Sequence, residues 1–116
     1  MSGQKVKCIL TEYTELSAFS ASPKECIHHL IPGNGLRKLA DEDGLVIPLT
    51  NYEHNRGPIE ERIHGNMAAE KLSKMLGQVA YEKEYYRSLL EAVDELEKGE
   101  DPAREVFRRR YGISYL

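Results

Sequence analysis

The chain lacks most features that would place it in a membrane, outside the cell or in a cysteine-rich class. Its 116 residues include two cysteines, Cys8 and Cys26, which form no CxxC pair, so neither a cysteine zinc knuckle nor a disulfide framework is expected. No apolar run approaches the roughly 20 residues that a membrane-spanning helix needs. The first residues lack the apolar core of a secretory signal, and we expect a cytoplasmic protein that does not enter the membrane.

The chain also lacks an excess of positive charge. A formal net charge of −3 argues against a protein whose main task is to coat nucleic acid. The charge does not exclude a nuclease, because a bound divalent cation supplies positive charge locally. A length of 116 residues and a hydrophobic content of 41% fit one globular domain, or a small domain with a helical extension.

Alternating short apolar runs and turn signals predict an α+β protein. Three stretches are expected to be strands: residues 5–10, 24–31 and 44–49. The sequence PGNG at residues 32–35 predicts a turn, and residues 36–44 are expected to hold a helical turn. Thr50 and Glu53 have the spacing of a capping box and predict a short helix there.

The second half of the chain is predicted to be helical. Asn66 is a good N-cap for a long amphipathic helix. Pro102 is expected at the first position of a further helix that Asp101 caps, with Gly112 just past its end. The expected apolar positions of the long helix are Leu72, Met75, Leu76, Val79, Ala80, Tyr85, Leu89, Val93 and Leu96. This stripe is more than a ~50-residue unit can cover, so we expect it to be core or the seam of a homodimer.

Histidine is confined to one window of the chain. His28 and His29 are adjacent, His54 and His64 follow, and no histidine lies outside residues 28–64. Neutral imidazole is a common ligand of catalytic transition metals and a general base near neutral pH. Three ligands, an open coordination position and one further imidazole are sufficient for metal-assisted hydrolysis.

The residues around these histidines resemble HNH-type nucleases, the ββα-metal or His-Me finger family, and more closely the divergent HNH-like proteins of phages and prophages. The resemblance rests on the segments IHHLIPG, DGLVIPL, EHN and IHGN. It covers residues 26–80 well and residues 102–116 loosely. The matching residues are His28, His29, Arg37, Gly44, Leu45, Leu49, His54, His64, Asn66, Gly77 and Gln78.

The resemblance implies a ββα-metal core with a long C-terminal helical extension and a role for each histidine. His28, His54 and His64 would bind one divalent metal ion: Zn, Mg, Mn or Ni. His29 would be the general base that activates a water molecule against a DNA phosphodiester. The implied activity is that of a metal-dependent DNA endonuclease in phage DNA processing or recombination.

Several assignments around the site have an alternative. Arg37, Lys38 and Arg56 are candidates for contacts with phosphate, and a plain surface role is equally compatible with the sequence. The acidic run at residues 41–43 is expected to be a solvated turn, with a hydrogen bond to the outer nitrogen of a ligand histidine as the alternative. We expect residues 1–66 to form the ββα-metal core with the histidine cluster, and residues 67–116 to be the extension.

Two other classes of function remain open from the sequence. The asparagine that usually precedes the second strand in the HNH family is absent, since Asp43 and Gly44 occupy that place. This absence and the acidic net charge favour a catalytically decayed, metal-stabilised DNA-binding or adaptor module. The third class is a metal-free helical interaction protein in which the histidines are incidental. Metal binding separates this class from the other two.

Overall fold

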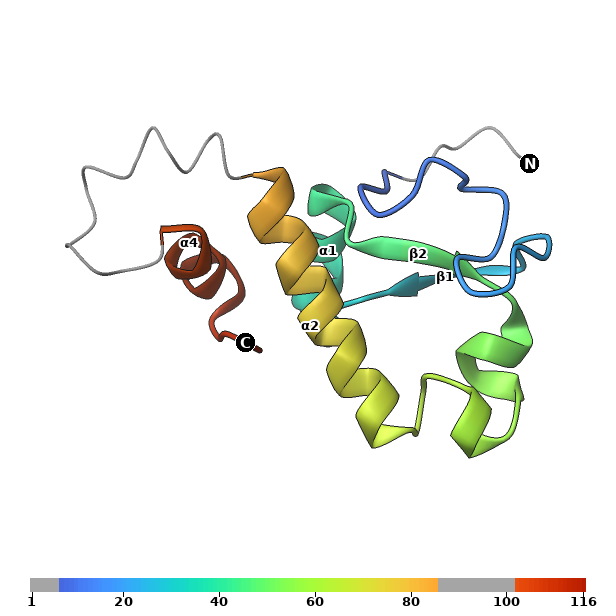
Figure 1. The fold of residues 1–116 in the computed structure, drawn as a ribbon. Coiled ribbons are helices and arrows are strands. Elements are labelled where there is room, and N and C mark those ends of the chain that lie inside the picture. Colours follow the sequence, from blue (N-terminus) through green and yellow to red (C-terminus); the bar gives the residue numbers. More distant parts are fainter. Residues whose placement is uncertain (1–6, 86–101) are drawn as a thin grey trace.

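The chain forms a small α+β protein with a two-stranded antiparallel sheet and helices, as expected (Figure 1). The computed structural model describes residues 7–85 and 102–116. Strand β1 (Cys26–His29) is followed by helix α1 (Leu36–Asp43) and strand β2 (Val46–Leu49). The chain continues through a π-helix, η1 (Tyr52–Arg56), and a 3₁₀ turn, η2 (Ile59–Glu61). Two helices, α2 (Met67–Glu84) and α4 (Pro102–Tyr111), complete the described part.

The prediction of an N-terminal strand is wrong for residues 7–10, the part of it that the structure describes. Residues 7–10 belong to no strand, and Ile9 donates a backbone hydrogen bond of 3.0 Å to Gly44 O. The segment lies against the glycine that ends α1 and is not paired along a strand. Residues 5 and 6 lie outside the described residues. So do Leu89, Val93, Leu96 and the cap expected at Asp101.

The register of the sheet is set by four residue pairs. Cys26, Ile27, His28 and His29 face Leu49, Pro48, Ile47 and Val46 in that order. Side chains alternate between the two faces of a strand, so His28 and His29 point to opposite faces. Pro48 has no N–H to donate, which suits a strand at a sheet edge.

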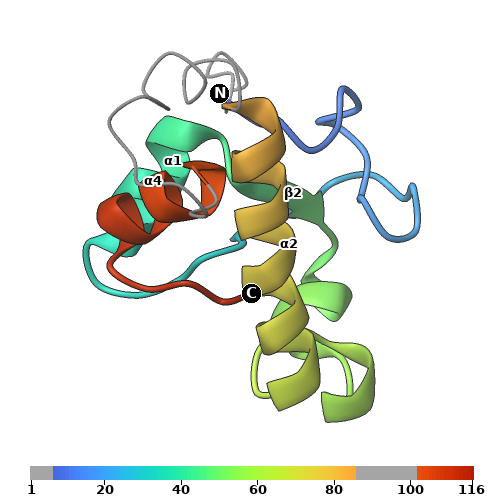
Figure 2. The same ribbon diagram turned by 60° about the vertical axis from the view of Figure 1, so that its left-hand side comes forward.

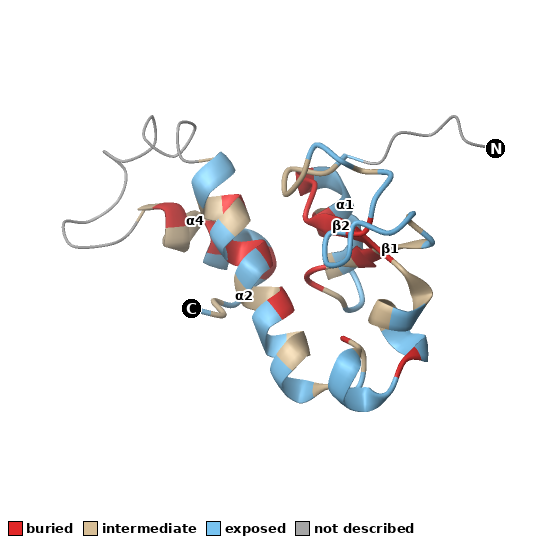
Figure 3. Cartoon of the chain, turned by 45° about the vertical axis from the view of Figure 1, so that its right-hand side comes forward, coloured by how far each residue is buried: buried red, intermediate tan, exposed pale blue. Residues whose placement is uncertain are grey.

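Helix α2 buries a face on which two small residues, Ser73 and Gly77, allow a close approach to the core. Its buried residues are Ser73, Gly77, Gln78 and Tyr81. A Cβ at Gly77 would lie 3.1 Å from Ile31 Cγ1 and from Leu30 Cβ, so only glycine allows the helix this close to the residues after β1. Figure 3 shows the buried side of α2 turned toward the core and its other side exposed.

The apolar stripe is expected to be core or the seam of a homodimer, and three of its described positions on α2 do not lie in the core. Leu72, Leu76 and Val79 are exposed to 63%, 43% and 49%. The reason is that Ser73 and Gly77 permit a closer approach than leucine would, so the helix buries that face instead. A homodimer seam along the exposed stripe stays a prediction.

Helix α4 packs against α2, and two of its residues bond the end of α1 (Figure 2). Phe107 is fully buried in the same cluster as Leu30 and Tyr81. Arg110 Nε donates to Asp43 Oδ2 at 2.6 Å, and the Tyr111 hydroxyl donates to the same oxygen at 2.7 Å. Burial, with the neighbouring Asp43 carboxylate, raises the pKa of the Tyr111 phenol. One hydrophobic cluster thus includes residues from both sides of position 66, and the division of the chain there stays a prediction.

The helix boundaries follow local signals. The Asn66 side chain accepts a hydrogen bond from Ala69 N at 3.1 Å, which confirms the predicted N-cap of α2. Helix α4 begins at Pro102, as predicted, and Gly112 follows it with φ +84° and a bond from its N–H to Arg108 O. Within residues 7–85 and 102–116, no helix has the length and apolarity to cross a membrane.

Gly44 is predicted to be sensitive to substitution because it combines a left-handed backbone with a tight contact. Its φ is +77°, and an added Cβ would lie 3.0 Å from Ile9 Cγ2 and 3.3 Å from Ile9 N. Gly44→Ala should lower the free energy of unfolding by about 2–3 kcal/mol, measured by urea denaturation. Gly35, with φ +80° and open space around it, is the matched control, and Gly35→Ala should cost about 1 kcal/mol. Equal losses would show that the contact with Ile9 contributes nothing.

Candidate metal centre

His54 and His64 are brought together by the chain between them. His54 lies on the π-helix η1, a helix type that often occurs at functional sites. Thr50 N donates to Glu53 Oε1 at 2.9 Å and Glu53 N donates to Thr50 Oγ1 at 3.3 Å, which is the predicted capping box. The N–H of His64 donates to His54 O at 3.0 Å, so the backbones of the two residues lie side by side.

His28 joins these two residues to form a cluster of three imidazoles. The ring centroid of His28 lies 5.2 Å from that of His54 and 5.2 Å from that of His64. The His54 and His64 rings are 4.5 Å apart, with 2.9 Å between their Nε2 atoms. One nitrogen from each of the three rings lies within 4.8 Å of the others. The structure therefore brings together the three predicted ligands.

The His28 ring is held by a chain of two hydrogen bonds. His28 is 1% exposed, and its Nε2 lies 2.8 Å from Ser73 Oγ. Ser73 Oγ donates its proton to Leu30 O at 2.9 Å. A hydroxyl has one proton, so Ser73 accepts from His28, whose Nε2 therefore carries the hydrogen. His28 Nδ1 is then an unprotonated nitrogen, and it is buried without a hydrogen-bond partner.

The surroundings of His28 and His54 favour the neutral form of their imidazoles. Burial, with the neighbouring His54 and His64, lowers the pKa of His28 to about 3. Burial also lowers the pKa of His54, with a further contribution from His64. Neutral imidazole is the form that binds metal ions, because its lone pair is free.

The donor set fits a transition metal. Three imidazole nitrogens without a carboxylate suit Zn or Ni better than Mg, which prefers oxygen ligands. Zn–N bonds of about 2.0–2.1 Å in a tetrahedral site place ligand nitrogens about 3.4 Å apart. The observed nitrogens need small side-chain movements to reach this arrangement. A buried lone pair without a partner costs free energy, and a bound ion would remove that cost.

His29 has a different hydrogen-bond partner from that of His28. Its Nε2 lies 2.8 Å from Asp41 Oδ1, on the last turn of α1. His29 and Arg37 line the same hollow as the three clustered histidines, with a volume of about 200 Å³. Lys38 and Arg56 are exposed and are not among the residues that line this hollow. The structure thus brings His29 and Arg37 to the cluster, but not Lys38 and Arg56.

Two polar residues at the site were not assigned from the sequence. Ser73 holds His28, and its place one turn before Gly77 marks the face on which α2 approaches most closely. Glu70 Oε2 lies 3.9 Å from His64 Nδ1 and accepts the N–H of Gly65 at 3.0 Å. Asp41 belongs to the acidic run, and it bonds His29 instead of a clustered histidine.

Comparison of the chain with protein-family models, with curated proteins and with solved structures finds no match. The function proposed below accordingly rests on the residues of the site.

The cluster predicts stoichiometric metal binding. In equilibrium dialysis of untagged protein against Zn²⁺, the wild type should bind about one ion per chain. His54→Ala removes one of three ligands and should weaken binding by at least about 100-fold. Lys71→Ala, an exposed change elsewhere on α2, should bind like the wild type. A wild type that binds no Zn²⁺, or a His54→Ala variant with unchanged affinity, would contradict the ligand assignment.

Proposed function

We propose that the protein is a metal-dependent endonuclease that hydrolyses DNA phosphodiester bonds on an HNH-like ββα-metal core. The observation that carries this proposal is the buried, unpartnered Nδ1 of His28 beside His54 and His64. The order of two strands followed by the helical segment η1, which bears His54, is compatible with such a core. Partial cover of the core by α2 and α4 supports the view that they are its helical extension.

His29 is suited to the role of general base. It lies next to the cluster in the same hollow and is not one of the three clustered rings. When Asp41 accepts the hydrogen on His29 Nε2, Nδ1 is left free to take a proton from water. The HNH asparagine that orients the base is absent here, and Asp41 supplies the bond to the outer nitrogen instead. The loss of that asparagine therefore does not leave His29 without support.

The remaining groups provide charge for a phosphate. Arg37 lines the hollow and supplies a fixed positive charge beside the histidines. A bound divalent ion would supply Lewis-acid stabilisation of the scissile phosphate and the leaving oxygen. Lys38 and Arg56 are exposed, so they would contact phosphates further along a strand. One arginine and one divalent ion together would give a cationic site in an acidic protein.

The proposal predicts that DNA-cleavage and Zn²⁺-binding assays distinguish the general base from the metal ligands. Purified wild type with Zn²⁺, Ni²⁺ or Mn²⁺ should cleave plasmid or single-stranded DNA, followed on gels. His29→Ala should lower the rate by about 10²–10⁴-fold because it removes the general base, while Zn²⁺ binding stays within about threefold. His54→Ala should lose both binding and cleavage.

Two outcomes of this experiment would contradict the proposal. Cleavage by His29→Ala at the wild-type rate would remove His29 as the base. A wild type that binds one ion but cleaves no DNA with any of these metals would contradict the nuclease. That result would favour the decayed metal-stabilised module in its place.

A further inference from the structure

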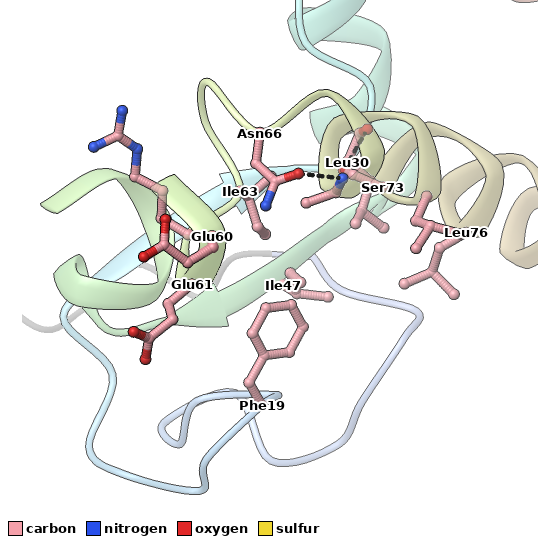
Figure 4. Close-up of a pocket in the computed structure, with 12 residues that line it drawn as sticks. Phe19, Leu30, Ile47, Glu60, Glu61, Ile63, Asn66, Ser73 and Leu76 are labelled. Carbon is pink, nitrogen blue, oxygen red and sulfur yellow. Dashed lines mark hydrogen bonds between the residues drawn. The ribbon is translucent and has the colours of Figure 1, made fainter. Parts of the chain in front are cut away.

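Ser73 joins two parts of the molecule that lie far apart in the sequence. It lies in the second turn of α2, 45 positions from His28 and 43 positions from Leu30. The residue is 5% exposed, so both of its hydrogen bonds are shielded from water. Figure 4 shows the Ser73 side chain beside Leu30, at the point where α2 meets the end of β1.

Ser73 bonds both His28 and Leu30 at the edge of a largely apolar hollow. Ser73 lines a hollow of about 360 Å³ together with the apolar side chains of Leu30, Ile47 and Ile63 (Figure 4). Asn66 also lines this hollow, but its amide is occupied by Ile59 O and Ala69 N. Loss of the Ser73 hydroxyl would therefore leave His28 Nε2 and Leu30 O without this partner.

The direction of the hydrogen bonds decides which nitrogen of His28 is free. Leu30 O accepts only, so Ser73 must give it the hydroxyl proton and must accept from His28. If Nδ1 carried the hydrogen instead, Nε2 would be a hydrogen-bond acceptor. Two acceptors, Nε2 and Ser73 Oγ, would then face each other at 2.8 Å. The backbone carbonyl of Leu30 thus selects the imidazole tautomer through one hydroxyl.

We propose that Ser73 is a positioning residue of the metal centre: its hydroxyl fixes the Nε2–H tautomer of His28 and presents Nδ1 to the ion. This inference rests on the metal site of the proposed function. It makes metal affinity depend on how closely α2 docks on the strand. Gly77, one turn after Ser73, sets that distance through its contacts with Leu30 and Ile31.

Three variants distinguish a role of Ser73 in orienting His28 from a role in packing helix α2. Ser73→Ala removes the hydroxyl, and Ser73→Thr retains it and adds a methyl group next to the hollow. Leu76→Ala is the matched control, because Leu76 is on the same helix and lines the same hollow without a bond to His28. The readouts are the ¹⁵N chemical shifts of the His28 ring in metal-free protein and the affinity for Zn²⁺ by competition with a chromophoric chelator.

We expect His28 of the wild type to be the Nε2–H tautomer. Ser73→Ala should give a mixture of tautomers and a Zn²⁺ affinity about 10–100-fold weaker, as for other groups that orient metal ligands. Ser73→Thr should restore the wild-type shifts and affinity to within about threefold, and Leu76→Ala should leave both unchanged.

Two results would overturn the inference. One is a folded Ser73→Ala protein with the wild-type tautomer and unchanged affinity. The other is an Nδ1–H tautomer in the metal-free wild type, which decides the question even if Ser73→Ala does not fold. A wild type that binds no Zn²⁺ would contradict the proposed function, while the tautomer still tests the hydrogen bond itself.

Discussion

The hydrogen-bond chain from His28 through Ser73 to Leu30 O is the constraint on which the rest of the site depends. A buried imidazole that lacked this partner would cost about 1–3 kcal/mol in unmet hydrogen bonding. With the partner present, Nε2–H is satisfied and Nδ1 alone is left over. This hydrogen-bond chain gives one nitrogen a structural role and leaves the other without a partner. It also joins β1 to α2, so a displacement of the helix would disturb the bond to His28.

The helices determine the geometry around these hydrogen bonds in two ways. Gly77 permits α2 to approach Leu30 closely, which brings the Ser73 hydroxyl into range. Helix α1 carries Arg37 and Asp41 toward the histidines, and its C-terminal end is held by bonds from α4 to Asp43. The C-terminal helix therefore supports the site without contributing a residue to its hollow.

The sequence predicted the elements that have strong local signals. Asn66, Pro102 and Gly112 mark helix ends by rules that depend on neighbouring residues alone, and the structure agrees. The concentration of histidine identified residues that the fold does bring together. The buried face of α2 was not predictable from apolar spacing, because close approach by Ser73 and Gly77 outweighs the burial of Leu72 and Leu76. The Ser73 bond is a contact across 45 positions, and no local pattern indicates it.

The most direct test is the position of a bound ion, determined by anomalous diffraction from crystals grown with Zn²⁺. We predict one ion at about 2.0–2.1 Å from His28 Nδ1 and from one ring nitrogen each of His54 and His64, with the Ser73 bond to His28 Nε2 intact. The assignment of the metal centre would be contradicted by an ion bound through His28 Nε2, by an ion elsewhere on the protein, or by no ion in this cluster.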